Sequence, residues 1–181
     1  KSTEHVRQIL TDIFMPVLLQ VIQGEVAGGP VPVSGVMFTT EAEARTAGVK
    51  TINAAPGHGE GVVQSLVKYD SWSVRCGGPK TIGLVNTLVR VKPQRLAPGL
   101  PGLKFVPNTK TLRSQACLDT NAVLALTLLG DKIEKYYQKP MDVEFVVMTE
   151  TKEIYLVQAR PIVFNDKKKP SYVQLTDALR E

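Results

Sequence analysis

The sequence predicts an α+β fold in which a mainly antiparallel β-sheet is packed with helices. Short segments rich in β-branched residues recur along the chain, separated by Gly, Pro and Asn turns. Helical periodicity occurs near the start and again late, without the regular strand–helix alternation of a parallel sheet. With 181 residues and 43% hydrophobic side chains, the chain can bury the core of one domain or of two small lobes.

The first part of the chain combines one predicted helix with several predicted strands. Residues 3–19 place apolar side chains at helical spacing, interrupted at Pro16, and predict an amphipathic helix. Residues 18–26 could leave that helix as a strand, and 28–30 predict a turn. Further strands are predicted at 31–40, 51–55, 62–67, 72–75 and 81–91.

The second part of the chain predicts a loop, a long helix and a hairpin. Four prolines and two glycines in residues 93–107 predict a surface loop or an insertion without regular structure. Residues 115–137 predict one long helix, either continuous or interrupted at Gly130. Two strands follow at 141–147 and 154–161, joined by a polar turn, and residues 170–181 predict an exit segment.

The closing hairpin carries the most informative chemistry. Its short turn can bring Glu144 opposite Gln158, and the period of two along a strand places Arg160 on the same face as Gln158. A carboxylate, an amide oxygen and a guanidinium suit a hard cation that carries a polyphosphate, because Mg²⁺ takes oxygen ligands and Arg binds phosphate oxygens in a fork. The hypothesis is a site for a nucleoside triphosphate.

The alternative is a plain amphipathic hairpin whose polar face meets water. Register distinguishes the two, because Glu144 opposite Gln158 divides the other residues between the faces. One face would then hold Val146, Met148, Ile154 and Leu156, and the other Val143, Phe145, Val147, Tyr155 and Val157. We therefore expect a hairpin buried on both sides. Such strands do not carry charged residues without partners, which favours the functional interpretation.

Composition sets limits on function. The 22 basic and 17 acidic residues give a net charge of +5 and a pI near 9.2, which permits anionic ligands without requiring them. The hypothesis of a nucleic-acid-binding domain rests on that net charge alone. The lysine run at 167–169 is typical of a solvated linker. Cys76 and Cys117 lack metal or redox spacing, so a reduced cytoplasmic protein is expected. No signal peptide or membrane span is predicted, and the start at Lys1 predicts a fragment of a larger protein.

Three motifs together resemble a known family. They are Ser-Gly-Val-Met-Phe-Thr at 34–39, Gly-His-Gly-Glu-Gly-Val-Val-Gln at 57–64, and Asp-Val-Glu-Phe at 142–145 with Gln-Ala-Arg-Pro at 158–161. In order and spacing they resemble the nucleotide-binding domain of the phosphoenolpyruvate synthase and pyruvate phosphate dikinase family. The resemblance implies that residues 19–162 form the C-terminal lobe of an ATP-grasp domain. Residues 1–18 would lead in from an N-terminal lobe outside this chain, and 163–181 would form a basic linker.

The resemblance also implies roles for individual residues. Glu144 and Gln158 would hold the Mg²⁺ that bridges the ATP phosphates, and Arg160 would contact the transferred phosphate. Gln20, Val21 and Ile22 resemble a hinge that meets the adenine edge, with a simple core strand as the alternative. Gly57 and Gly59 would form a close backbone turn near the phosphates, with Glu60 orienting a cation or a basic side chain.

Other positions match less well. Asp70 matches a family aspartate and is equally typical of a turn residue before Ser71. His58 replaces the usual leucine between the two glycines, Ser65 replaces a glycine, and Phe145 replaces a tryptophan. The first departure lies within the predicted phosphate loop.

The activity implied by the resemblance is a phosphotransferase reaction. ATP would phosphorylate a histidine in a separate domain, which passes the phosphate to pyruvate bound in a barrel domain. Neither His5 nor His58 has the setting of that histidine, so the fragment alone is expected to be inactive. Relatives that phosphorylate glucans or rifampicin, and a regulatory module without catalysis, are the alternatives. The acceptor, the reaction direction and a homodimeric parent enzyme stay open.

Overall fold

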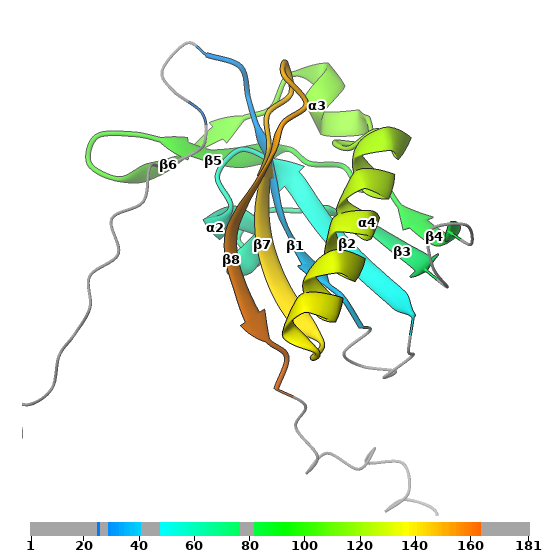
Figure 1. Ribbon diagram of the computed structural model, residues 1–181. Helices are drawn as coiled ribbons and strands as arrows, with labels where there is room; N and C mark the ends of the chain where they lie inside the picture. Colours follow the sequence, from blue (N-terminus) through cyan, green and yellow to red (C-terminus); the bar gives the residue numbers. More distant parts are fainter. Residues whose placement is uncertain (1–24, 26–28, 41–47, 77–81, 164–181) are drawn as a thin grey trace, which may run out of the picture.

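The structure is a computed structural model that describes residue 25 and residues 29–40, 48–76 and 82–163 (Figure 1). The predicted helix at 3–19, the hinge at 20–22 and the exit segment at 170–181 lie outside the described residues. The same holds for the predicted strand at 18–26, apart from Glu25.

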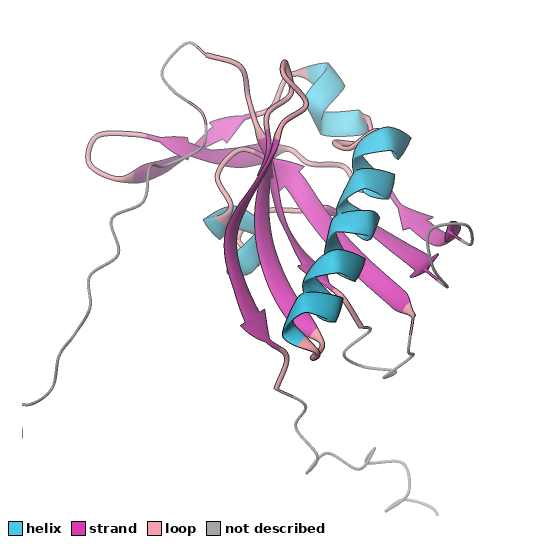
Figure 2. Ribbon diagram, in the orientation of Figure 1, coloured by secondary structure: helices cyan, strands magenta, loops and turns pink. Residues whose placement is uncertain are grey.

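An antiparallel six-stranded sheet dominates the described residues, with strand order β4-β3-β2-β1-β7-β8, and a two-stranded sheet β5-β6 lies beside it (Figure 2). The strands are β1 (Val33–Phe38), β2 (Val49–Pro56), β3 (Asp70–Cys76), β4 (Ile82–Leu88), β5 (Gln94–Pro98), β6 (Leu103–Pro107), β7 (Met141–Val147) and β8 (Ile154–Pro161). The helices are α2 (Glu60–Val63), α3 (Lys110–Ser114) and α4 (Thr120–Tyr137). The predicted α+β class with a mainly antiparallel sheet is confirmed. Among the described segments, no helix qualifies by length and hydropathy as a membrane span.

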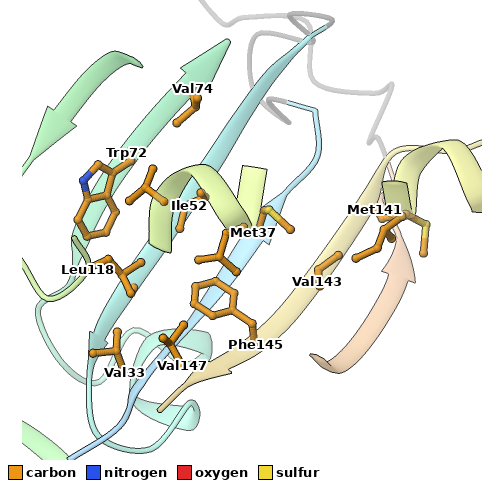
Figure 3. Close-up of a cluster of buried hydrophobic side chains, with 14 residues drawn as sticks. Val33, Met37, Ile52, Trp72, Val74, Leu118, Met141, Val143, Phe145 and Val147 are labelled. Carbon is orange, nitrogen blue, oxygen red and sulfur yellow. The ribbon is translucent and has the colours of Figure 1, made fainter. Parts of the chain in front are cut away.

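Helix α4 covers one face of the large sheet and builds the main core (Figure 1). Sheet residues such as Met37, Ile52 and Phe145 pack beneath it and are at most 1% exposed (Figure 3). The helix runs through Gly130 without interruption, so the continuous alternative is correct. A Cβ at this position would lie 2.8 Å from Met37 Sδ, so the glycine lets the helix approach β1 closely.

The opposite face carries a second, smaller core. Its members come from β1, β2, α2, β5 and the segment after α2: Val36, Ala55, Val62, Val67 and Leu96. We call this side the α2 face. The strand predicted at 62–67 is wrong, because the backbone N–H groups of Val62 and Val63 turn back onto the carbonyl of Gly59 and form a short helix instead.

Residues 93–107 also differ from the prediction of an irregular loop. They form the β5–β6 hairpin, in which Leu96 and Ala97 are buried. Pro98 and Pro107 end the two strands, while Pro101 lies in the turn between them. Proline is tolerated at such positions, so these residues limit the strands without preventing them.

The predicted helix at 115–137 begins later than expected. Gln115 has an extended backbone after α3, and α4 starts only where the Asp119 side chain accepts the backbone N–H of Ala122 at 2.8 Å. Between the two helices, the backbone N–H of Cys117 donates to Asp70 Oδ2 at 2.9 Å. A buried carboxylate therefore interrupts the helical pattern that periodicity alone predicts.

Candidate functional site

The hairpin of β7 and β8 has the predicted register. Glu144 lies opposite Gln158, and the same antiparallel pairing places Asp142 opposite Arg160. Val143 lies between the two acids and is buried in the core under α4, so Asp142 and Glu144 point to the α2 face. Two carboxylates, an amide and a guanidinium therefore come together on one face of the sheet.

Between these polar residues and the turn of the hairpin, a β-bulge reverses which face of the sheet each β8 side chain points to. The register shifts between Glu144 and Phe145, so that Phe145 pairs with Leu156 and Val157 is left as the extra residue. The predicted faces of Ile154, Tyr155 and Leu156 are therefore wrong. Tyr155 shares the face of Glu144, while Ile154 and Leu156 share the face of Phe145.

Burial of the hairpin on both sides is also wrong for β8. This strand is one of the two edge strands of the six-stranded sheet, and Leu156 and Val157 are each 40% exposed. Strand β7 lies one place further in, and its Val143, Phe145, Val146 and Val147 are buried. The functional interpretation therefore depends on the geometry of the polar groups and no longer on burial of the whole hairpin.

Asp142 and Arg160 form a close ion pair. Arg160 Nε and Nη2 both donate to Asp142 Oδ2, at 2.9 and 2.7 Å. The hydrogen bond to Asp142 and the charge of that carboxylate raise the pKa of Arg160, and Glu144 adds to the effect. The Arg160 side chain is 60% exposed, so its remaining N–H groups are open to a ligand.

The other oxygen of Asp142 has a different environment. Oδ1 is buried and has no hydrogen-bond partner among the described residues. Buried acceptors are nearly always paired, so an unpaired one indicates strain or a missing ligand, ion or water. The sequence interpretation overlooked Asp142, although its place two residues before Glu144 and its pairing with Arg160 were signals.

Glu144 and Gln158 provide oxygen donors without competing contacts. Glu144 is half-buried, Gln158 is exposed, and neither side chain hydrogen-bonds to another residue that the structure describes. Within that part of the chain there is no group of three His, Cys, Asp or Glu residues able to hold a metal by itself. Mg²⁺ commonly binds through one or two carboxylates plus substrate phosphates. These residues fit that type of site.

The loop at 57–60 follows β2 on the α2 face. Gly57 has φ +97°, and a Cβ there would lie 2.4 Å from the carbonyl oxygen of Leu96, so this position requires glycine. Ser34 Oγ donates to the Gly57 carbonyl at 2.7 Å, and the His58 backbone N–H donates to Leu96 at 2.8 Å. A Cβ at Gly59 would meet only ordinary contact at 3.6 Å. The steric need for glycine is therefore specific to Gly57.

Side chains of this loop make local contacts. His58 Nδ1 accepts the backbone N–H of Glu60 at 3.3 Å, so His58 fits the loop despite replacing leucine. Glu60 Oε1 accepts Gln64 Nε2 at 2.6 Å, and no contact within the described residues joins Glu60 to Glu144 or Arg160. Ser65, at the position of a family glycine, has φ +56°, in the left-handed region that favours glycine.

Glu25 shows where the chain arrives from the predicted hinge. Arg95 Nε and Nη2 donate to its two carboxylate oxygens at 2.9 and 2.7 Å. This hydrogen bond with Glu25 raises the pKa of Arg95. A Cβ at Gly57 would also lie 3.0 Å from the Cβ of Arg95. The chain three residues after Ile22 is thus held beside the glycine loop, an anchor that no sequence motif indicated.

Asp70 belongs to a different kind of site. It is fully buried at the start of β3, where Oδ1 accepts Lys92 Nζ at 2.8 Å and the Arg90 backbone N–H at 2.9 Å. The interpretation of Asp70 as a turn residue is therefore wrong. Nearby, burial raises the pKa of the Cys117 thiol well above its usual range, and the thiol donates to the Ala54 carbonyl at 3.2 Å.

Comparison with known proteins gives a consistent set of relatives. The chain is 34% identical to a probable phosphoenolpyruvate synthase from Methanocaldococcus jannaschii, over 75% of this chain and 11% of that protein. It is 30% identical to a phosphoenolpyruvate synthase from Aquifex aeolicus, over 78% of this chain and 18% of that protein. It is 29% identical to a rifampicin phosphotransferase from Bacillus cereus, over 81% of this chain and 18% of that protein. The chain thus spans less than a fifth of each relative.

The family match covers nearly all of the sequence. The family described as "Pyruvate phosphate dikinase, AMP/ATP-binding domain" matches residues 7–180. The resemblance inferred from the motifs is therefore confirmed, and the antiparallel α+β architecture agrees with an ATP-grasp-like lobe. This chain belongs to the pyruvate phosphate dikinase AMP/ATP-binding domain family.

Proposed function

We propose that this chain is the lobe that binds Mg²⁺ and the ATP phosphates in an ATP-dependent phosphotransferase of the phosphoenolpyruvate synthase type. One observation carries the proposal. Asp142, Glu144, Gln158 and Arg160 lie together on the α2 face, and Asp142 keeps one buried oxygen without a partner among the described residues. Relatives named phosphoenolpyruvate synthase support the choice of reaction.

Each residue of the group has a distinct task. Arg160, held on one side by Asp142, would direct its exposed N–H groups at the oxygens of the transferred phosphate. Glu144 and Gln158 would hold the Mg²⁺, which when bound neutralises part of the phosphate charge. Because phosphoryl transfer is loosely bonded and highly charged, positioning and electrostatic stabilisation are the main contributions that a protein makes.

The rest of the nucleotide would lie along the α2 face. Gly57 and Gly59 bring backbone close to the phosphates, and Glu60 orients a cation or a basic side chain beside them. Gln20, Val21 and Ile22 would meet the adenine. The described residue that follows this stretch, Glu25, is paired with Arg95 beside the glycine loop, which supports this arrangement.

Other parts of the same polypeptide would complete the enzyme. An N-terminal ATP-grasp lobe would close over ATP, a histidine in a swivelling domain would take the β-phosphate, and a barrel domain would bind pyruvate. This chain covers only 11% and 18% of the length of two phosphoenolpyruvate synthase relatives, which supports such a division. We place the enzyme in the cytoplasm and expect the chain alone to be inactive, with at most weak ATP binding.

A second candidate differs only in the acceptor. The match to a rifampicin phosphotransferase favours an enzyme whose further domains present an antibiotic in place of pyruvate. The Asp142–Arg160 and Glu144–Gln158 group would serve both reactions, because it acts on ATP. Assay of the full-length protein with pyruvate and with rifampicin distinguishes them.

The test uses Glu144→Ala and Arg160→Met in the full-length protein, with phosphohistidine formation from ATP as the readout. Loss of one electrostatic contact to the transition state lowers rates by about 10²–10³-fold. The matched control is Glu150→Gln, an exposed acid in the turn of the same hairpin, which should retain the parent rate. Unchanged rates in both site variants would overturn the proposal. Micromolar ATP affinity of the chain alone would contradict the need for a second lobe.

A further inference from the structure

A buried lysine lies under the last turns of α4, on the side of the sheet away from the candidate site. Lys50 in β2 is 2% exposed. Its ammonium group donates to the Thr39 carbonyl at 3.2 Å and to Glu134 Oε2 at 3.3 Å. The other oxygen of Glu134 accepts Thr40 Oγ1 at 3.4 Å. Burying an ammonium group is unfavourable without such partners, and the proposed phosphate contacts do not include it.

Thr39 connects this lysine to the start of β7. It is fully buried just beyond the last residue of β1, and it bonds to Met141 in both directions. The Thr39 backbone N–H donates to the Met141 carbonyl at 2.9 Å, and the Met141 N–H donates to Thr39 Oγ1 at 2.8 Å. Met141 directly precedes Asp142. A short series of contacts therefore runs from Glu134 through Lys50 and Thr39 to the carboxylate that holds Arg160.

We propose that Lys50 is a positioning residue for the Asp142–Arg160 pair and acts through Thr39. By fixing the Thr39 carbonyl, Lys50 holds the end of β1 against β7, where Phe38 lies opposite Asp142. The position of Asp142, and with it the direction of Arg160, follows from that pairing. The inference rests on the proposed function, because it concerns the same site.

The first test separates the rate of reaction from ATP binding in the full-length protein. Lys50→Met should lower kcat by about tenfold with the KM for ATP nearly unchanged, because small displacements of a catalytic group reduce rate before they reduce binding. Lys50→Arg, which keeps the charge, should recover most of the rate. Lys135→Met is the matched control, since Lys135 also pairs with a carboxylate of α4 but is 66% exposed, and it should retain the parent kcat.

A double-mutant cycle tests the route of the effect. If Lys50 acts through Arg160, Lys50→Met together with Arg160→Met should be no slower than Arg160→Met alone. If the rate losses of the two single variants multiply in the double variant, the inference is overturned and the proposed function stays intact. Parent rates for both Arg160→Met and Glu144→Ala would overturn the proposed function itself, so the two failures are distinguishable.

A second pair of variants covers the case in which Lys50→Met fails to fold. Thr39→Val removes the hydroxyl that accepts the Met141 N–H, while Thr39→Ser keeps it. We expect Thr39→Val to lose kcat and Thr39→Ser to retain it. Equal kcat values for the two variants would contradict the route through Thr39.

Discussion

Two aspartates of the large sheet, Asp70 and Asp142, each pair with a cationic side chain, but they differ in how many of their hydrogen-bonding groups have partners. In the Asp70–Lys92 pair both side chains are fully buried, and Lys92 Nζ donates to Asp70 and to the carbonyls of Arg90 and Gln115 at 2.8 to 3.0 Å. In the Asp142–Arg160 pair the arginine is mostly exposed and one carboxylate oxygen has no partner in the described part of the chain. An ion pair whose hydrogen-bonding groups all have partners, such as Asp70–Lys92, stabilises a fold, and we call it the closed pair. An ion pair that leaves such groups without partners, such as Asp142–Arg160, can accept a ligand, and we call it the open pair.

The largest expected effect is on the closed pair. Lys92→Met would leave the Asp70 carboxylate buried without its cation, and we expect a loss of about 3–5 kcal/mol in the free energy of unfolding. Urea unfolding followed by circular dichroism measures it. Lys135→Met, at an exposed pair, should keep the parent midpoint. A similar midpoint for Lys92→Met would show that the buried pair adds no stability.

The next effect is the dependence of stability on pH at Cys117, whose backbone N–H donates to Asp70 of the closed pair. Because burial raises the pKa of Cys117 from its ordinary value near 9, only the unfolded thiol ionises as pH rises past that value. The folded state then binds more protons, so the thiol's contribution to stability is full below pH 9 and falls above it by up to about 1.4 kcal/mol per pH unit. Urea unfolding between pH 8 and 10.5 should show a smaller decline for Cys117→Ala. Equal slopes would mean that the thiol ionises in the fold.

A smaller effect concerns strain on the α2 face. Ser65 has φ +56°, and Ser65→Gly should relieve strain and raise the free energy of unfolding by about 1 kcal/mol. Thermal unfolding measures the gain, and the phosphotransfer rate of the full-length protein should not change. A decrease in stability would show that the serine conformation carries no strain.

A comparably small effect on stability is expected at the open pair. Arg160 is mostly exposed and the Asp142 side chain is 13% exposed, so water can partly replace the guanidinium, and Arg160→Met should lose about 1 kcal/mol in urea unfolding, less than Lys92→Met. Together with loss of phosphotransfer, this result would separate function from stability. A loss as large as that of Lys92→Met would remove the distinction between the two pairs.

Local patterns predicted part of this molecule well. Alternation on two strands and a short polar turn were enough to place Glu144 opposite Gln158. The Asp70–Lys92 pair could not be predicted, because it joins residues far apart in the sequence through burial that no local pattern records. The four prolines of residues 93–107 predict an irregular loop, whereas the β5–β6 hairpin forms because two of these prolines lie at strand ends.

The candidate site was predicted in outline from motifs. The structure places Arg160, Glu144 and Gln158 on the same face of the β7–β8 hairpin. The Glu60 side chain instead hydrogen-bonds to Gln64. Asp142 follows from the same register, because the pairing that puts Glu144 opposite Gln158 also puts Asp142 opposite Arg160. The bulge at Val157 had no signal, because one extra residue leaves the composition of a strand unchanged.

Val157, the extra residue in β8, lets one strand point apolar side chains to the core at one end and polar side chains to the candidate site at the other. On the turn side of Val157, Ile154 and Leu156 point with the core residues of β7, and beyond it Gln158 and Arg160 point with the acids. An uninterrupted strand would have sent either the apolar pair or the polar pair to the wrong side. The length of this segment is therefore constrained more tightly than its amino-acid types, and removal of one residue here would be more damaging than most substitutions.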